Sequence, residues 1–380
     1  MTSPRFTAFD RLAMSRALAL AERGLETTHP NPRVGCVIAR DGRIVGEGWH
    51  AFAGEPHAEV LALRAAGEAA RGASVYVTLE PCSHHGRTPP CVQALVAAGV
   101  ARVVFALGDP DSRVDGRGAA ALRAAGIAVD AGLMEADAAE LNVGFLMRMR
   151  HGRPFVRMKI AASLDGRTAL ANGASRWITG EAARADVQRW RARSSAVMTG
   201  IGTVLADDPR LDVRHPADFH RQPLRIVLDG GLRTPPAARL LAPPGNVLIL
   251  TASDDLPRGK ALEARGARVE RLRPGAGDGA HGARVDLAVV MSMLASLEMN
   301  EVLIEAGATL NGALLGARLV DELLLYVAPT LLGPHAKPLA LLPQLDRMEE
   351  RSAFAVVENS VIGGDLRIRL RPAAAGIVGA

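Results

Sequence analysis

Hydrophobic positions along the chain fall into short continuous runs that alternate with longer alanine-rich segments. In the first half, runs typical of buried strands cover 34–39, 43–49, 74–79, 102–107 and 126–130. Segments typical of helices cover 6–24, 58–70, 90–98, 117–125 and 133–148. Strands that alternate with helices predict a three-layer α/β domain over residues 1–150.

The pattern restarts after a basic segment with glycine and proline at 148–154. A new strand is expected directly after it, and further strand-like runs cover 196–202, 224–230, 246–252, 301–307, 321–329 and 366–370. They predict a second α/β domain over residues 151–380, in which the glycine-rich stretch 274–285 is a surface loop. Two domains also suit a chain of 380 residues.

The apolar content is high enough for two real cores, at 48% of residues. No run of about 18 uncharged apolar residues occurs, so no membrane span is expected. Charged residues break the apolar N-terminal stretch, which therefore predicts an amphipathic helix and not a signal peptide. With three cysteines and no export signal, we expect a cytoplasmic protein without disulfides.

The net charge of +5 is carried almost entirely by arginine, because the only lysines are Lys159, Lys260 and Lys337. This bias reflects either proteome composition or a preference for anionic ligands, since arginine binds phosphate in a forked geometry. Aromatic residues make up 3% of the chain, too few for a surface that stacks nucleic-acid bases. We therefore expect no nucleic-acid partner.

Two of the three cysteines share one segment with a histidine and an acid. His57, Cys82 and Cys91 have the side chains of a catalytic zinc site, which uses three protein ligands and leaves one position for water. Such a metal brings the pKa of water down toward neutrality. Glu59, two residues after His57, is placed to act as a general base and then as an acid. Cys91 begins a predicted helix, where a thiolate is favoured.

Taken one by one, these residues could equally be core residues. Together they match the zinc deaminase signature H-x-E…P-C-x-x-C in every ligand type. The spacing differs, because the polar stretch "SHHGRTPP" separates Cys82 from Cys91 and could reach over a substrate. Cys36 lies within a predicted strand and is interpreted as a core thiol.

The second domain contains two strand-to-helix turns with glycine. In "LIEAGATLNGALL", backbone N–H groups at the helix start could bind a phosphate, and Gly307 would let the ligand approach closely. "MTGIGTVLADDP" offers a similar turn with Gly200, Gly202, Thr203 and Asp207. Neither stretch is the dinucleotide-binding G-x-G-x-x-G. The pattern alone leaves ordinary turns and a nucleotide site equally open.

Long motifs in both halves resemble one family, the bifunctional diaminohydroxyphosphoribosylaminopyrimidine deaminase/reductase of riboflavin biosynthesis. They include "HPNPRVGCVIARDGRIVGEGWH", "LEPCSHHGRTPPCVQALVAAGVARVVFALGDPD", "KIAASLDGRTALANGASRWITG" and "LIEAGATLNGALLGARLVDELLLYVAPTLLG". The resemblance covers the whole chain and is weakest around 235–300. It implies a cytidine-deaminase-like α/β/α domain, a dihydrofolate-reductase-like α/β domain, zinc and NADPH as cofactors, and a homo-oligomer formed through the reductase domain.

The resemblance also implies roles for particular residues. Asn31 would contact the pyrimidine, and His50, His84 and Arg87 would surround the ribosyl phosphate. The NADPH contacts would be Ala161, Trp177, Thr203, Asp207, Gly307, Ala308 and Thr309. The substrate contacts in the reductase domain would be Ser175, Arg191, Leu211, Arg214 and Glu305. The family often has Asn-Pro where this chain has Asp111 and Ser112, so this loop receives no detailed role.

Physical chemistry is compatible with several of these roles. Arg191 and Arg214 could hold a ribose 5-phosphate in forked, charge-assisted pairs. Trp177 could pack against the nicotinamide. Without the family, Trp177 would be interpreted as a core residue and Arg191 as an exposed helix charge. Asp165 is expected to be a structural turn residue, and no residue is identified as the proton donor of the reduction.

We therefore predict two consecutive reactions on phosphorylated pyrimidines, a hydrolytic deamination and an NADPH-dependent reduction of a ribosyl to a ribityl chain. A nucleic-acid deaminase with an unrelated second domain is one alternative, although it would favour P-C-x-x-C and more aromatic residues. A structural protein with a closed four-ligand zinc site is another, in which His84 or His85 would be the fourth ligand. Glu59 would then have no role.

Overall fold

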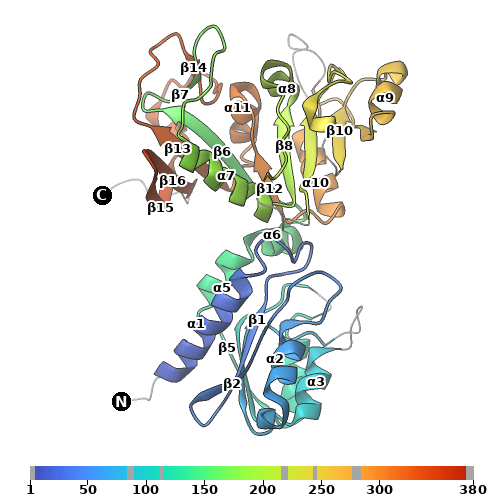
Figure 1. Cartoon of the computed structure of the whole chain (residues 1–380), viewed down its shortest axis with the longest axis vertical. Helices are drawn as coiled ribbons and strands as arrows, with labels where there is room; N and C mark the ends of the chain where they lie inside the picture. The colour runs from blue at the N-terminus through green and yellow to red at the C-terminus, as the bar shows by residue number, and fades with distance from the viewer. Residues whose placement is uncertain are drawn as a thin grey trace. The chain divides into compact units, whose positions relative to one another are not determined.

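The computed structural model of the chain describes residues 5–83, 90–111, 114–214, 221–242, 246–275 and 284–373. The chain divides into two compact units, Met1–Gly152 and Arg153–Ala380 (Figure 1). Among the described residues, no helix combines the length and the apolar character needed to cross a membrane.

The first unit is built on a five-stranded sheet with the order β2-β1-β3-β4-β5. Its strands are β1 (Gly35–Arg40), β2 (Arg43–Trp49), β3 (Ser74–Leu79), β4 (Arg102–Leu107) and β5 (Ala128–Ala131). β1 runs antiparallel to both β2 and β3, whereas β3, β4 and β5 are parallel. These strands lie where the apolar runs predicted them.

Helices cover both faces of this sheet (Figure 1). They are α1 (Ala8–Glu22), α2 (Ala58–Ala66), α3 (Cys91–Ala98), α4 (Arg117–Ala124), α5 (Glu135–Leu141) and α6 (Val143–His151). Along β1 the side chains alternate: Cys36 and Ile38 pack with α2, α3 and α4, while Val37 and Ala39 pack with α1, α5 and α6. The predicted three-layer α/β/α architecture is thus confirmed.

Two predicted helices differ in detail from the structure. The segment 133–148 forms α5 and α6, which meet at Asn142, and α6 continues to His151 inside the expected basic hinge. The segment 58–70 forms α2 followed by a short 3-10 turn (Gly67–Ala70). Gly67 has a φ of 53°, a left-handed value that interrupts an α-helix and that glycine adopts readily.

The second unit contains a nine-stranded sheet with the order β11-β10-β9-β8-β12-β6-β13-β16-β15. Its strands are β6 (Phe155–Ser163), β8 (Ala196–Gly200), β9 (Leu224–Leu228), β10 (Val247–Thr251), β11 (Ala267–Arg271), β12 (Glu301–Ile304), β13 (Glu322–Ala328), β15 (Phe354–Ile362) and β16 (Asp365–Pro372). All neighbours from β11 to β13 are parallel, and β16 and β15 add antiparallel pairs. This is the mixed sheet that the resemblance implies.

Helices flank this sheet, and a small separate pair of strands lies beside it (Figure 1). The helices are α7 (Glu181–Arg193), α8 (Ile201–Asp207), α9 (Leu256–Glu263), α10 (Leu287–Ser296) and α11 (Ala308–Gly316). The pair is β7 (Arg167–Ala169) with β14 (Lys337–Pro338). Short 3-10 turns occur at Arg239–Leu241 and Met348–Glu350. The expected loop 274–285 lies mostly outside the described residues.

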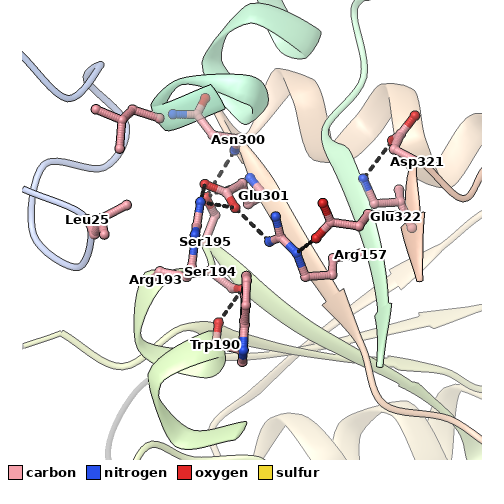
Figure 2. Close-up of polar contacts among 12 residues, drawn as sticks. Leu25, Arg157, Trp190, Arg193, Ser194, Ser195, Asn300, Glu301, Asp321 and Glu322 are labelled. Carbon is pink, nitrogen blue, oxygen red and sulfur yellow. Dashed lines mark hydrogen bonds and ion pairs between the residues drawn. The ribbon is translucent and has the colours of Figure 1, made fainter. Parts of the chain in front are cut away.

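A buried ion network ties the central strands of this sheet together. Arg157 of β6 is 1% exposed and donates to Glu301 of β12 at 2.8 Å and to Glu322 of β13 at 2.6 Å (Figure 2). Arg369 of β16 also donates to Glu322, at 2.8 Å. Burial would raise the pKa of Glu322, but Arg157 and Arg369 hold it at about 2. Pairing is what makes buried charges tolerable.

Candidate active sites

The three expected zinc ligands of the first unit come together at the ends of three elements. His57 directly precedes α2, Cys91 is the first residue of α3, and Cys82 follows β3. Their ligand atoms all lie within 4.8 Å of one another. His57 Nδ1 is 3.2 Å from Cys91 Sγ and 3.6 Å from Cys82 Sγ. The polar stretch that lengthens the cysteine spacing therefore does not prevent convergence.

This arrangement fits zinc. Bond lengths of about 2.0 Å to nitrogen and 2.3 Å to sulfur place neighbouring ligands of a tetrahedral shell about 3.5–3.8 Å apart. The distances from His57 to Cys82 and Cys91 are close to this range. The hydrogen bond between the two thiols lowers the pKa of Cys82 and raises the pKa of Cys91, so the pair readily supplies one thiolate before any metal binds.

Glu59 lies in the first turn of α2, two residues after the expected ligand His57, and is 3% exposed. Burial raises the pKa of Glu59, although His57 acts in the opposite direction. The close packing of α2 on β2 holds this turn in place. A Cβ added at Gly48 would lie 2.3 Å from the carbonyl oxygen of Ala58, so only glycine permits this approach.

His50 and Asn31 form a fixed pair next to the ligands. The Asn31 Nδ2 atom lies 3.0 Å from His50 Nε2, and His50 Nδ1 lies 3.2 Å from the carbonyl oxygen of Pro56. Because that carbonyl can only accept, His50 carries its proton on Nδ1 and accepts from Asn31 at Nε2. The His50 ring is 3% exposed and meets the His57 ring edge-on at 5.4 Å. Both ring nitrogens of His50 thus contact protein groups, and one of these groups belongs to Pro56, the residue before His57.

Other residues expected near this site fall outside the described ranges. They are His84, His85, Arg87 and Ser112. Asp111 is buried, and its backbone N–H donates to Asp109 at 2.9 Å. Burial raises the pKa of Asp109 to about 6, with the charges of Asp111 and Glu80 adding to the effect. Cys36 is fully buried in the core between β1 and the α2 layer, as a core thiol would be.

The second unit has a cavity of about 2130 Å³ at the carboxyl ends of its parallel strands. Every residue that the resemblance implies for this domain lines it: Ala161, Ser175, Trp177, Arg191, Thr203, Asp207, Leu211, Arg214, Glu305, Gly307, Ala308 and Thr309. These side chains come from the end of β6, the β8–α8 turn and the β12–α11 turn, among other segments. The fold thus brings distant parts of the sequence to one site.

A buried arginine–glutamate pair forms one wall of this cavity. Arg191 donates to Glu305 through Nε at 2.5 Å and Nη2 at 3.0 Å, and its Nη1 donates to the carbonyl oxygen of Asp212 at 2.9 Å. Arg191 is only 8% exposed, so it is not the surface charge that helix position alone suggests. Three of the five guanidinium N–H groups of Arg191 donate to protein acceptors, and its expected contact with a phosphate stays a prediction.

Arg214 contrasts with Arg191. Its side chain is 53% exposed at the cavity and pairs with Asp212 at 2.8 Å. Trp177 is 69% exposed and lies 4.4 Å from the guanidinium of Arg184, so it is not a core residue. Thr203 of α8 accepts a hydrogen bond from the Gly307 N–H at 3.1 Å, which joins α8 to the β12–α11 turn. Arg214 therefore keeps the exposure that an anion-binding side chain needs.

Comparisons with known proteins match both units. Residues 154–362 match the family model "RibD C-terminal domain". Residues 7–107 match the model "Cytidine and deoxycytidylate deaminase zinc-binding region". The riboflavin biosynthesis protein RibD of Escherichia coli is 50% identical over 372 residues, which cover 95% of this chain and 99% of that protein. The RibD of Haemophilus influenzae is 43% identical, with 97% and 98% covered.

The chain belongs to the RibD family of riboflavin biosynthesis proteins.

Solved structures agree with this assignment. Acinetobacter baumannii RibD in its form 1 superimposes with a TM-score of 0.88 at 46% identity, covering 96% of this chain and 99% of that one. A deaminase/reductase from Thermotoga maritima superimposes with a TM-score of 0.82 at 31% identity, with 96% and 99% covered. The predicted fold class is confirmed in both domains.

As a RibD family member, the chain is a bifunctional riboflavin biosynthesis enzyme with a deaminase and a reductase activity. Its cofactors are zinc and NADPH, as predicted. Relatives of the same full length rule out a nucleic-acid deaminase joined to an unrelated domain. Membership in an enzyme family likewise rules out a purely structural zinc protein.

Lys159 is a polar group of the reductase cavity that the sequence analysis missed. It lies on β6, lines the cavity, and its Nζ is 3.8 Å from the Glu305 carboxylate. Burial lowers the pKa of Lys159 despite the opposing charge of Glu305. One signal was available, because lysine is rare in this chain and only this lysine sits in a predicted central strand.

Asp165 has the role that the sequence suggested. Its carboxylate accepts hydrogen bonds from the backbone N–H groups of Leu332 and Gly333, at 3.1 and 2.8 Å, and from the Ser163 hydroxyl at 2.5 Å. These contacts join the turn after β6 to the segment after β13. Asp165 thus organises two loops, and its acceptor contacts are all with protein groups.

Proposed function

We propose that residues 1–150 deaminate 2,5-diamino-6-(5-phosphoribosylamino)pyrimidin-4-one and that residues 151–380 then reduce its ribosyl chain to a ribityl chain. The observation that carries this proposal is the pairing of two unlike sites in one chain. One is a compact His/Cys/Cys group with a buried acid beside it, and the other is a large cavity with a buried ion pair. The Thermotoga maritima relative is described as the deaminase and reductase of these two steps.

In the deamination, His57, Cys82 and Cys91 hold the zinc, which when bound polarises a water so that it is nucleophilic near neutral pH. Glu59 accepts a proton from this water while oxygen bonds to the ring carbon that carries the 2-amino group. Glu59 then gives the proton to the departing nitrogen. The C–N bond breaks, ammonia leaves, and a uracil-type ring remains.

Substrate orientation in this domain is assigned to the loop around Asn31. The Asn31 amide would hydrogen-bond the pyrimidine, and His50 supports this amide through the contact at 3.0 Å. His50 was also expected beside the ribosyl phosphate, and that role is kept as part of the proposal. His84 and Arg87 would complete the phosphate site.

In the reduction, the cavity would hold NADPH as the hydride source for C1′ of a ring-opened imine form of the ribosyl chain, and the imine nitrogen would take up one proton from water. We assign cofactor binding to Ala161, Trp177, Thr203, Asp207, Gly307, Ala308 and Thr309. Substrate binding is assigned to Ser175, Arg191, Leu211, Arg214 and Glu305, and Arg191 also holds Glu305 in place. Lys159 joins this group because its ammonium faces the same carboxylate.

The charges of the cavity suit a phosphorylated substrate. Arg214 is exposed enough to reach a phosphate, and its present partner Asp212 also pairs with Arg210, so that carboxylate keeps an arginine if Arg214 turns to the ligand. Glu305 remains an anion because Arg191 outweighs the effect of burial and holds its pKa at about 2. An anionic acceptor is suited to the hydroxyl or amine groups of the substrate.

Two further assignments concern the cellular location and the oligomeric state of the enzyme. We place it in the cytoplasm, which is consistent with three cysteines that are all free. We also expect a homo-oligomer that forms through the reductase domain. Sedimentation of the purified enzyme tests the second assignment, since a single-chain mass of 39.9 kDa would contradict it.

The test of the function follows both activities in one reaction. Purified enzyme is mixed with the diaminopyrimidinone ribosyl phosphate and NADPH, and ammonia release is recorded together with the loss of absorbance of the reduced cofactor. We expect ammonia to appear first and NADPH oxidation to follow. A zinc chelator should stop both signals, because the reductase then receives no deaminated substrate. Oxidation of NADPH without ammonia release would contradict the proposed order.

A further inference from the structure

Asn142 is a buried amide at the junction of α5 and α6, with 2% of its surface exposed. Its Oδ1 accepts the backbone N–H of Arg33 at 2.8 Å, and its Nδ2 donates to the carbonyl oxygen of the same residue at 3.0 Å. Nδ2 also donates to the Ala138 carbonyl at 3.3 Å. One side chain thus satisfies both main-chain groups of Arg33, as a neighbouring strand would.

The Arg33 side chain strengthens the same connection. Its Nη1 donates to the Leu141 carbonyl oxygen at 2.7 Å, so main chain and side chain of Arg33 both reach the end of α5. Arg33 is itself 8% exposed. A buried polar group that loses its hydrogen-bond partner destabilises the fold. These contacts therefore fix the position of the Arg33 backbone.

The contacts of Arg33 with Asn142 and Leu141, here called the clamp, hold one end of the loop that carries Asn31. Asn31 precedes Arg33 by two residues. On one side of Asn31, its own backbone N–H donates to the Thr28 carbonyl at 2.9 Å. On the other side, Val34 accepts the backbone N–H of His50 at 2.9 Å. The His50 ring in turn orients the Asn31 amide. Arg33 lies between these two contacts, and Asn142 holds its main chain from a helix junction outside the loop and its neighbouring strand.

We propose that Asn142 is a positioning residue for the deamination: it fixes the backbone at Arg33 so that the Asn31 amide meets the pyrimidine ring. The inference rests on the substrate role given to Asn31 above. It extends the deaminase site beyond the region that resembles other cytidine deaminases, because that match ends at residue 107. The helices α5 and α6, which lead to the reductase domain, would thereby be needed for substrate orientation in the first reaction.

The sharpest variant is Asn142→Asp in the full-length enzyme. It keeps the size and shape of the side chain but replaces two N–H donors by an oxygen, which faces the carbonyl oxygens of Arg33 and Ala138. We expect kcat/KM for deamination to fall roughly 10- to 100-fold, the effect of misplacing a substrate-orienting group by about 1 Å. The loss should appear mainly in KM, because Asn31 binds the ring before and during the reaction.

A matched control separates positioning from general loss of stability. Tyr76→Phe removes another buried hydrogen bond of the same domain, from the Tyr76 hydroxyl to Asp10 at 2.7 Å, without touching the Asn31 loop. It should lower Tm while leaving the deamination kinetics unchanged. In Asn142→Asp, zinc content and the NADPH oxidation rate with the deaminated intermediate should both stay at wild-type values.

The double variant Asn31→Ala/Asn142→Asp tests whether the effect passes through Asn31. If it does, the double variant is no slower in deamination than Asn31→Ala alone. Losses that multiply, or an Asn142→Asp enzyme within twofold of wild type, would overturn the inference. If Asn142→Asp does not fold, Asn142→Ala removes the clamp without the oxygen–oxygen repulsion and is judged by the same criteria.

These outcomes are distinct from a failure of the proposed function. A wild-type enzyme that releases no ammonia from the diaminopyrimidinone contradicts the function itself. A wild-type enzyme that does so, combined with an Asn31→Ala variant of normal kcat/KM, leaves the function intact and removes the positioning role of Asn142.

Discussion

Each of the two sites buries a glutamate almost completely, but the surroundings of the two carboxylates are opposite. Glu59 lies beside the zinc ligands, and burial raises its pKa. Glu305 is held by Arg191 and Lys159, which outweigh burial and keep its pKa at about 2. Desolvation controls the first group, and ion pairing controls the second.

The opposite pKa shifts of Glu59 and Glu305 determine which chemistry each carboxylate can perform. A carboxyl group with a raised pKa takes up a proton more readily than an ordinary one, which suits a group that accepts a proton and returns it. A carboxylate locked in a bidentate ion pair stays charged and serves as a fixed acceptor. Glu59 is therefore suited to proton transfer, while the paired acid of the reductase cavity is suited to accepting hydrogen bonds.

The largest effect should come from Glu59→Gln. The amide keeps the size of the side chain and leaves the three ligands in place, but it cannot relay a proton. We expect deamination to fall by about 10²- to 10⁴-fold, with zinc content unchanged. Ammonia release and metal analysis of the purified variant measure this. Reduction of the deaminated intermediate is the internal control and should proceed at the wild-type rate.

A second large effect should come from Arg191→Met. The substitution leaves Glu305 buried without its bidentate partner, and breaking a buried pair in this way costs about 3–5 kcal/mol. We expect the free energy of unfolding of the reductase domain to fall by about this amount, together with loss of NADPH oxidation. Denaturant unfolding measures it. A variant as stable as wild type would mean that the Arg191–Glu305 pair contributes little to the free energy of unfolding. The electrostatic difference between Glu59 and Glu305 would then be smaller than the geometry indicates.

Arg214→Ala should act on binding and not on stability. The side chain is half-exposed and its ion pair is correspondingly weak, at about 0–1 kcal/mol. We expect KM for the phosphorylated substrate in the reductase step to rise about tenfold, which corresponds to about 1.4 kcal/mol. Steady-state kinetics with the deaminated intermediate check this. An unchanged KM would remove Arg214 from the phosphate site.

Asp109 in the first unit tests the effect of burial on stability, since burial raises its pKa from an ordinary 3.8 to about 6. The folded state therefore binds this proton more tightly than the unfolded state, and its stability should rise as the pH falls from about 6 toward 4. Asp109→Asn should stabilise the domain at pH 7 by at most about 3 kcal/mol, the equivalent of a shift of two pKa units. Thermal unfolding at pH 7 and below pH 4 would show the gain disappear if the assignment is right.

Much of this architecture could be predicted because it depends on local patterns. Apolar runs identified the strands β1, β3 and β4, since a strand buried on both faces has little polar alternation. The zinc ligands were recognisable because His57, Cys82 and Cys91 stand at the starts or ends of such elements. The backbone at the end of a strand or the start of a helix is fixed by that element, so the side chains there have few possible positions.

Other features could not be predicted, because they join residues far apart in the chain. Arg191 meets Glu305 across 114 positions, and Asn142 meets Arg33 across 109. Neither pair has a local pattern, so helix position alone made Arg191 an exposed charge, and Asn142 was placed inside one long helix. Lys159 was overlooked for the same reason, as only the folded sheet brings it to 3.8 Å from Glu305.

The amino-acid sequence by itself determined the two α/β domains, the zinc ligands with their acid, and the family to which the enzyme belongs. These follow from hydrophobic periodicity and from motifs in which residue type and spacing carry the chemistry. Only the tertiary structure decided which charges are paired, which arginine stays exposed at the cavity, and which amide contacts the Asn31 loop. Burial and partner distance control these properties, and both arise when distant segments pack together.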